Sequence, residues 1–336
     1  MKPTDFAGHL TQYLGAYLPG QRNVSANTIK SYRDTFRLLL RYCRDERGLV
    51  VDRLTLQMVT ASLIEDFLHW LMETRGNQGA TRNQRLAAIH GFFRYLQHED
   101  PARLLACQQI LAIPFRRHPR TPVRHLTTEG LQAVLAQPDQ QTPSGRRDLT
   151  LLCVLYDTGA RVQELVDLTV RDVRLEAPAV IRLTGKGRKT RHVPLMARTV
   201  TLLESYLQER RLTTPDLLDH PLFYNRQHHK LTRAGVTYVL RKSVEQARSQ
   251  TTGLPETVTP HLVRHTKAMH LLQANVNLIY IRDLLGHVDI KTTEVYARAD
   301  TEMKRQALAQ LPPPPGPTER PTWDEDEPLL AWLNSL

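Results

Sequence analysis

One stretch of the sequence holds two residues whose types and spacing could support a reaction. In LLGHVDIKTTEVYAR, residues 284–298, His287 follows an apolar run and Tyr296 comes nine residues later. A histidine can donate a hydrogen bond or a proton, and a tyrosine oxygen can act as a nucleophile. Taken alone, the stretch favours a purely structural interpretation: a helix that ends at Gly286, a threonine-capped helix after it, and a core tyrosine. Whether this stretch takes part in a reaction depends on which other residues of the chain lie near it.

Two cations earlier in the chain could meet an anionic group. Arg161 follows Gly159 at the start of a helix in TGARVQEL, where a guanidinium and helical N–H groups could bind one phosphate. The alternative is a surface ion pair with Glu164, three positions on. Lys186 stands at the tip of a predicted hairpin in GKGRKTRHVPL, where a turn lysine could also be merely solvated.

A third group lies in PHLVRHTKAMHLL. Thr259 and Pro260 mark a helix start, which places His261 and Arg264 one turn apart on the same face. On a basic protein such a pair is unremarkable by itself. We expect His265, next to Arg264, to pack or brace rather than react.

Several common catalytic motifs are missing from the sequence. It has no P-loop, no GxGxxG, no HExxH, and no carboxylates with the spacing of a two-metal nuclease site. The three cysteines lie far apart, without a CxxC pair, which favours reduced thiols in a cytosolic protein. No apolar run reaches the roughly 18 residues that span a bilayer. We therefore expect no metal, no cofactor and no membrane.

Charge points to the class of partner. The formal net charge is +11, and residues 312–336 carry five acidic residues against one arginine, or −4, so residues 1–311 carry +15. Such a positive field favours polyanions, of which nucleic acid is the commonest.

Hydrophobic periodicity predicts a mainly α protein with one small antiparallel sheet. Residues 1–113 read as an N-terminal helical domain, with helices in 25–48, 60–76 and 80–100. Residues 127–311 read as a second, mostly helical domain in which the Gly-Lys-Gly turn joins two strands.

Two segments without helical periodicity complete the organisation. Residues 114–126 carry three prolines and four arginines, which predicts a basic linker that would let two basic domains close around a duplex. Residues 312–336 form a proline-rich, acidic tail with an apolar cluster, which fits either a disordered acidic tail or a segment that docks on a neighbouring subunit. The linker cations predicted to bind DNA are Arg116, Arg117, Arg120 and Arg124.

Four segments together resemble the motifs of the tyrosine recombinase (phage integrase) family, because they occur in the order and at the separations of that family. They are TGARVQELVDL, GKGRKTRHVPL, HLVRHTKAMHLL and LLGHVDIKTTEVYA, within residues 127–311. Xer-type and transposon-borne members are the most similar. Residues 1–113 fit the family's core-binding domain by pattern and position, whereas the tail matches no family feature.

The resemblance implies a role for each candidate. Tyr296 would attack a DNA phosphodiester and form a 3′-phosphotyrosyl link with a free 5′-hydroxyl, which requires neither ATP nor metal. Arg161 and Arg264 would clamp the phosphate. His287 would donate a hydrogen bond to it. His261 would serve as acid or base, and Lys186 would protonate the leaving oxygen, although Arg188 and Lys189 compete for that role. Glu164 matches the residue that braces the first arginine.

The resemblance also implies the biological setting. It predicts a site-specific recombinase that binds double-stranded DNA as a dimer on each site and a tetramer in synapsis. An accessory recombinase or a DNA-bending protein could be a further partner, and the location would be the cytoplasm, at the nucleoid. The alternatives are a type IB topoisomerase that relaxes DNA as a monomer and a non-catalytic DNA-binding relative. The expected processes are integration, excision, transposition or dimer resolution.

Overall fold

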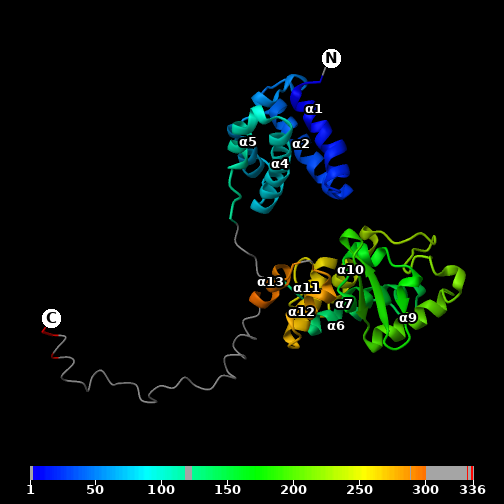
Figure 1. The fold of residues 1–336 in the computed structure, drawn as a ribbon. Helices are drawn as coiled ribbons and strands as arrows, with labels where there is room; N and C mark the ends of the chain where they lie inside the picture. The colour runs from blue at the N-terminus through cyan, green and yellow to red at the C-terminus, as the bar shows by residue number, and fades with distance from the viewer. Residues whose placement is uncertain (1–2, 118–122, 288, 300–330, 332–333, 336) are drawn as a thin grey trace. The chain divides into compact units, whose positions relative to one another are not determined.

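The computed structural model describes residues 3–117, 123–287, 289–299, 331 and 334–335. The chain divides into two compact units, residues 1–121 and 122–336. Both are mainly helical, and the one sheet of the described residues lies in the second unit (Figure 1). The prediction of a mainly α protein with a small antiparallel sheet is confirmed.

The first unit is a bundle of helices. Its elements are α1 (Asp5–Gln12), the π-helix η1 (Tyr13–Gln21), α2 (Ala26–Asp45), η2 (Val51–Arg53), η3 (Leu56–Met58), α3 (Ala61–Glu73), α4 (Gly79–Glu99), η4 (Pro101–Arg103) and α5 (Leu104–Leu111). Ser25 caps α2 by accepting a hydrogen bond from the Thr28 amide, as a helix start in 25–48 requires. Phe36, Leu39 and Phe92 lie in the shared core, which is rich in aromatic rings.

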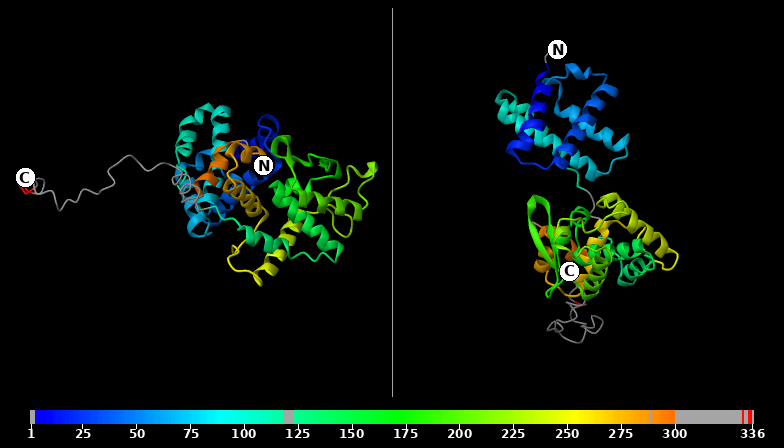
Figure 2. Two further views of the ribbon diagram at one scale, coloured as in Figure 1. Left: turned by 90° about the horizontal axis from the view of Figure 1, so that it is seen from below. Right: turned by 90° about the vertical axis from the view of Figure 1, so that its right-hand side faces the viewer.

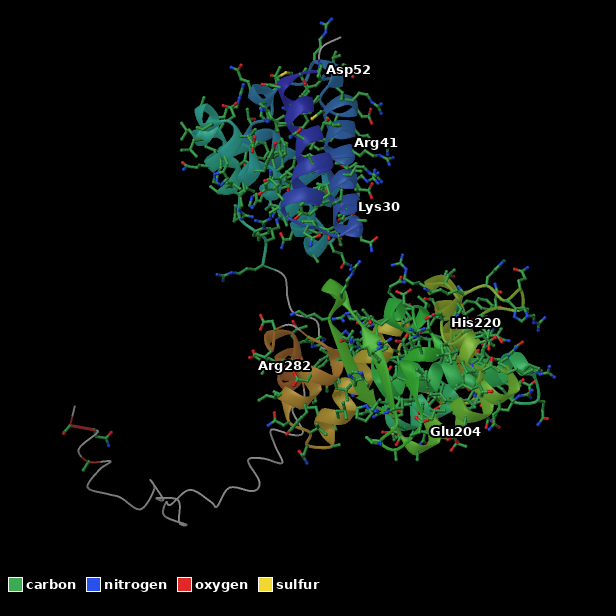
Figure 3. The ribbon with its side chains drawn as sticks, turned by 45° about the vertical axis from the view of Figure 1, so that its right-hand side comes forward. Lys30, Arg41, Asp52, Glu204, His220 and Arg282 are labelled. Atoms are coloured by element: carbon green, nitrogen blue, oxygen red, sulfur yellow. The ribbon has the colours of Figure 1, made fainter. Side chains whose placement is uncertain are left out.

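The face of α2 that points away from the core is basic. Lys30, Arg33, Arg37, Arg41 and Arg44 recur every three or four residues, so they share one side of the helix, and all are exposed. Figure 3 shows Lys30 and Arg41 projecting from α2. We name these five residues the α2 basic stripe.

The described ends of the predicted linker are held by hydrogen bonds. On α4, Arg82 donates to the Pro114 carbonyl (2.9 Å), and Asn83 both donates to and accepts from the Arg116 backbone (2.8 and 3.0 Å). In the second unit, the Leu126 amide donates to Thr266 Oγ1 (3.0 Å). Residues 114–116 therefore pack with the first unit, which the proline and arginine content alone did not indicate.

The second unit combines helices with a three-stranded sheet. Its elements are α6 (Thr128–Leu135), α7 (Pro143–Thr158), α8 (Val162–Val166), η5 (Val170–Asp172), β1 (Val173–Arg174), β2 (Val180–Thr184), η6 (Lys186–Arg188), β3 (Thr190–Pro194), α9 (Ala197–Glu209), η7 (Pro215–Leu217), α10 (Arg233–Arg248), α11 (Pro260–Gln273), α12 (Leu278–Leu285) and α13 (Lys291–Ala299).

The sheet is the predicted hairpin with one short strand added. β2 and β3 pair antiparallel, with Leu183 opposite Arg191, and β1 pairs with β2 on the other edge. The strands lie to one side of the helices, and β3 contacts α12 (Figure 2, right). Ile181, Leu183 and Val193 point into the core because the strands alternate.

Helix α11 lies at the centre of the second unit. It packs against α7, α10, α12 and α13, and Ala268, Met269 and Leu272 on it join a cluster with Ile281, Leu285 and Tyr296. This arrangement brings segments that lie far apart in the sequence to one place. Within residues 3–117, 123–287 and 289–299, no helix has the length and apolar character needed to cross a membrane.

A buried ion pair ties α11 to α7. Lys267 Nζ lies 3.2 Å from Asp157 Oδ1, with side-chain exposures of 9% and 2%, and Asp157 Oδ2 accepts from the Met196 amide (2.7 Å). Asp157→Ala would leave the ammonium buried without its partner, so we expect a loss of about 3–5 kcal/mol in the free energy of unfolding. Denaturant titration of the purified protein measures this loss. Asp219→Ala, which breaks the exposed pair with Arg171, should change it little; equal effects would contradict the prediction.

Candidate active site

Arg161 and Glu164 form the first part of the site, at the start of α8. Gly159 ends α7 in the left-handed conformation (φ 56°), and Arg161 then occupies the N-cap position of α8. Glu164 accepts hydrogen bonds from the Arg161 amide and guanidinium, both at 2.8 Å. The Glu164 side chain is 4% exposed, whereas that of Arg161 is 41% exposed. The pair is therefore a buried carboxylate that holds a half-open guanidinium, rather than a surface ion pair.

Arg264, on α11, is held by two backbone carbonyl groups near Arg161. Its guanidinium donates to the Gly159 carbonyl (2.7 Å) and the Leu285 carbonyl (2.5 Å), and the residue is 2% exposed. Burial, and then the neighbouring Arg161, lowers the pKa of Arg264 to about 10, so it remains a cation at neutral pH. One arginine thus links the end of α7 to the end of α12.

Tyr296 reaches this site from α13. Its hydroxyl lies 2.8 Å from Nδ1 of His265 on α11, and the residue is 2% exposed. Burial raises the pKa of Tyr296, and Arg264 acts in the opposite direction. The phenol is therefore protonated at neutral pH and held by a histidine.

His287 lies beside the tyrosine, and His261 lies one residue further away, against His265. The exposed His261 packs edge-on against His265, with 4.2 Å between ring centroids. The His287 ring lies parallel to that of Tyr296 (14°, 6.4 Å), and its Nδ1 lies 2.9 Å from Thr293 Oγ1. The turn at Gly286 (φ 65°) brings His287 back over α13, which explains the nine-residue spacing.

Burial, together with neighbouring charged groups, keeps these histidines neutral. Burial first, and then nearby cations, lowers the pKa of His265 and of His287 to about 4. The same causes lower the pKa of His261. Neutral imidazoles at pH 7 can each accept or donate a proton.

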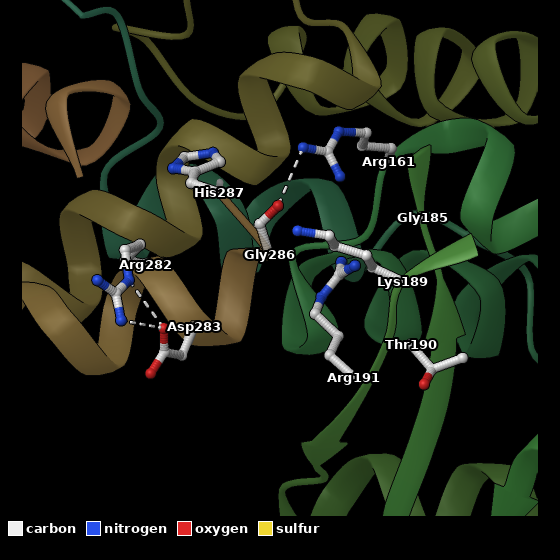
Figure 4. Close-up of a pocket in the computed structure, with 9 residues that line it drawn as sticks. All are labelled: Arg161, Gly185, Lys189, Thr190, Arg191, Arg282, Asp283, Gly286 and His287. Atoms are coloured by element: carbon white, nitrogen blue, oxygen red, sulfur yellow. Dashed lines mark hydrogen bonds and ion pairs between the residues drawn. The ribbon is translucent and has the colours of Figure 1, made fainter. Parts of the chain in front are cut away.

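A hollow of about 500 Å³ opens beside Arg161 and His287 (Figure 4). Its walls come from the η6–β3 turn and the end of α12, and Figure 4 shows the nitrogen-bearing ends of Arg161, Lys189 and Arg191 on one side of it. The full lining is Arg161, Gly185, Lys189, Thr190, Arg191, Arg282, Asp283, Gly286 and His287. Such a cationic hollow suits an anion such as a phosphate diester.

Comparison with known proteins identifies the family. The sequence pattern described as "Phage integrase family" matches residues 124–303, and "Phage integrase, N-terminal SAM-like domain" matches residues 10–100. The chain is 39% identical over 336 residues to "Putative integrase/recombinase y4rC" of Sinorhizobium fredii, which covers 100% of this chain and 99% of that protein. The chain belongs to the phage integrase family.

Further similarities agree with this integrase assignment. The tyrosine recombinase XerD of Listeria monocytogenes is 31% identical over 299 residues, 88% of this chain and 96% of that protein. The crystal structure of the XerH site-specific recombinase bound to palindromic difH substrate shares the fold, with a TM-score of 0.67 at 23% identity over 86% of this chain and 81% of that chain. The integrase is thus an enzyme of the tyrosine recombinase class, a DNA strand-transferase.

The integrase structure brings most of the predicted residues together. Tyr296 contacts His265 and His287, and His261 adjoins them through His265. Arg161 binds Glu164, and Arg161 and Arg264 donate to the carbonyls of Gly286 and Leu285, just before His287. Lys186 opens η6 at the hairpin tip, but its side chain lies outside the described residues. The linker residues Arg116, Arg117 and Arg124 are exposed and belong to no part of this site, and Arg120 lies outside the described residues.

Arg191 and the α2 basic stripe of this integrase were not predicted from the sequence. Arg191 contacts Glu164 within the site, and only its place two residues after the competing Lys189 hinted at it. The α2 basic stripe carries a clear signal, because five cations recur at helical spacing in residues 30–44. Within the described part of the integrase, no group of three His, Cys, Asp or Glu side chains has the arrangement of a metal site.

The neutral histidines predict how stability depends on pH. His265 and His287 have pKa values of about 4 in the folded protein against 6.5 when unperturbed. Between those values the unfolded chain binds more protons, so the free energy of unfolding should fall as the pH drops from 6.5 to 4. Denaturant titrations at several pH values across this range measure the free energy of unfolding, which should depend less steeply on pH in His265→Asn than in the wild type. Replacement of the exposed His229 by Asn should leave the pH dependence of the free energy of unfolding as in the wild type. The same pH dependence in His265→Asn and the wild type would refute the lowered pKa of His265.

Proposed function

We propose that this integrase cuts and rejoins duplex DNA at specific sites through a covalent bond between Tyr296 and a 3′-phosphate. The observation that carries the proposal is the convergence of the Tyr296 hydroxyl with a buried arginine, a half-open arginine and three neutral histidines. These residues come from the start of α8, from α11, from the turn after α12 and from α13. A phenol with a raised pKa requires such cations before it can attack a phosphate.

In the proposed reaction, the Tyr296 oxygen forms a bond to phosphorus as the bond to the 5′-oxygen breaks. Arg264 and Arg161 neutralise the non-bridging oxygens, and His287 donates a hydrogen bond to one of them. His265 was expected from the sequence only to pack or brace, but its Nδ1 lies 2.8 Å from the Tyr296 hydroxyl, so we propose that it accepts the phenolic proton, with His261 assisting as acid or base. Lys186 delivers a proton to the 5′-oxygen. A 5′-hydroxyl of another strand then reverses the step and releases Tyr296.

Binding of the duplex would involve both units. The α2 basic stripe offers cations to DNA phosphates, and the linker residues Arg116, Arg117, Arg120 and Arg124 would contact further phosphates. Neutralisation of several phosphates makes affinity fall steeply with salt. We place this activity in the cytoplasm, at the nucleoid, with a dimer on each site and a tetramer in synapsis. An accessory recombinase or DNA-bending protein would be a further partner.

Family membership favours this activity over DNA relaxation by a type IB topoisomerase and over a non-catalytic role. The intact set of candidate residues agrees with a catalytic protein. Integration, excision, transposition and dimer resolution all use the same two strand transfers, so the proposal covers the common chemistry.

Covalent trapping tests the proposed function. The protein is mixed, with a chelator and without ATP, with nicked duplex fragments from its source genome, and complexes that survive SDS are isolated. Peptide and DNA-end sequencing should find a 3′-phosphate on Tyr296 at a small number of discrete sites. Adducts spread over all sequences, with relaxation of plasmids, would instead support a topoisomerase. Bound DNA without any adduct would support the non-catalytic alternative.

The acidic tail gives a separate prediction about assembly. Residues 312–330 lie outside the described residues, and we propose that segment 312–336 docks on a neighbouring subunit. Deletion of 312–336 should weaken the pairing of two sites at least about tenfold more than binding to one site, because only pairing requires every subunit contact. Gel-shift titrations with one and two sites measure both quantities. Equal losses in the two assays would exclude docking.

A further inference from the structure

Arg191 lies where three parts of the active site meet. From β3 it donates to both Glu164 oxygens, at 3.1 and 2.7 Å, and through Nε to the Leu284 carbonyl, at 2.8 Å. Its side chain is only 12% exposed. A single guanidinium therefore connects the strand after the hairpin tip, the carboxylate that holds Arg161, and the last turn of α12 before His287.

Two glycines make room for this contact. A Cβ on Gly286 would lie 3.0–3.2 Å from the Nη1, Cδ and Cζ atoms of Arg191, and Gly286 also has φ 65°. A Cβ on Gly185 would lie 2.9 Å from Glu164 Oε1. Larger residues at either position would push apart the carboxylate and the guanidinium that it binds. Both segments containing a glycine, GKG and LLGH, therefore converge on the same ion pair.

The charges explain why a second arginine is useful here. Glu164 alone would cancel the charge of Arg161, the guanidinium that stays open to the hollow. With Arg191 bound to the same carboxylate, the three side chains retain a net charge of +1. Burial raises the pKa of Glu164, but the hydrogen bonds from Arg191 and Arg161 outweigh burial and lower the pKa overall. The carboxylate thus stays ionised and shared.

We propose that Arg191 is a positioning residue for DNA cleavage. It fixes Glu164 so that Arg161 faces the phosphate with its charge available, and it ties the hairpin that carries Lys186 to the turn that carries His287. Although Arg191 lines the hollow, in this scheme it acts through its bonds to Glu164 and the Leu284 carbonyl and not by contact with the phosphate. The inference rests on the function proposed above, because it assigns Arg191 to the same site.

Chemical rescue tests the proposal. Single-turnover cleavage is measured on a nicked substrate saturated with protein, for wild type, Arg191→Ala and Arg191→Lys. We expect Arg191→Ala to bind DNA normally but cleave about tenfold more slowly or worse. Free guanidinium ion, at a concentration too low to unfold the protein, should restore part of the rate. Arg191→Lys should be intermediate, since an ammonium cannot make the three contacts at once.

Arg182→Ala is the matched control. Arg182 lies on the neighbouring strand and pairs with Asp172 at 2.9 Å, outside the site, so its loss should leave cleavage within about twofold of wild type. Cleavage by Arg191→Ala at the wild-type rate would overturn the proposal. Slow cleavage that neither guanidinium nor Arg191→Lys improves, with a lowered Tm, would also overturn it in favour of a purely structural role. Absence of a wild-type adduct would count against the proposed function itself.

Discussion

Tyr296→Phe should abolish the covalent DNA adduct and leave DNA binding within about twofold of wild type. Phenylalanine retains the ring that packs with Ile281 and Leu285 but lacks the oxygen that would bond to phosphorus. The lost hydrogen bond to His265 should lower the free energy of unfolding by about 1 kcal/mol. Adduct yield on nicked DNA, together with gel-shift affinity, measures the outcome.

Tyr280→Phe is the control for this substitution. Tyr280 lies on α12 and is 70% exposed, so its hydroxyl takes no part in the buried cluster. That variant should form adducts at the wild-type rate. If Tyr296→Phe also did so, another nucleophile would have to be sought.

Arg264→Ala should have the second largest effect on cleavage. Removal of one group that stabilises transition-state charge costs about 10²–10³ in rate. Arg264 is buried and bonded to the Gly159 and Leu285 carbonyls, so its loss also leaves two carbonyl groups without their donor. Single-turnover cleavage at saturating protein separates the rate from binding.

Arg264→Lys distinguishes charge from geometry. A lysine keeps the positive charge but cannot donate to both carbonyls and a phosphate in the planar arrangement of a guanidinium. We expect it to recover the Tm more than the rate. A rate for Arg264→Ala less than tenfold below wild type would contradict the phosphate clamp.

Local sequence signals predicted much of this fold. Ser25, Thr127 and Gly159 mark helix ends through hydrogen bonds or backbone angles that depend on near neighbours. The hairpin turn was predicted for the same reason. Helix α9 and the two-residue strand β1 were not predicted. Strand β1 is too short to show a periodicity, and it forms by pairing with β2.

The site was less accessible from local pattern. The spacing of Arg161 and Glu164 allowed a surface pair, but in the fold Glu164 is buried and also binds Arg191 of β3, which in turn binds the Leu284 carbonyl of α12. Arg191 went unrecognised because the direction of a strand side chain depends on register and on elements more than ninety residues away, such as Leu284. Resemblance to a family selected the right segments, but the contacts between them required the fold.

The burial of Tyr296 has a consequence for how the protein discriminates among DNA sequences. At 2% exposure, its oxygen cannot touch a phosphate until α13 or the groups over it shift. Binding free energy from the DNA must supply that shift, so only the fraction of complexes that completes it can react. A DNA sequence that binds weakly is therefore cut more slowly for two reasons: fewer sites are occupied, and a smaller fraction of the occupied sites can react. Selectivity in cutting can thus exceed selectivity in binding.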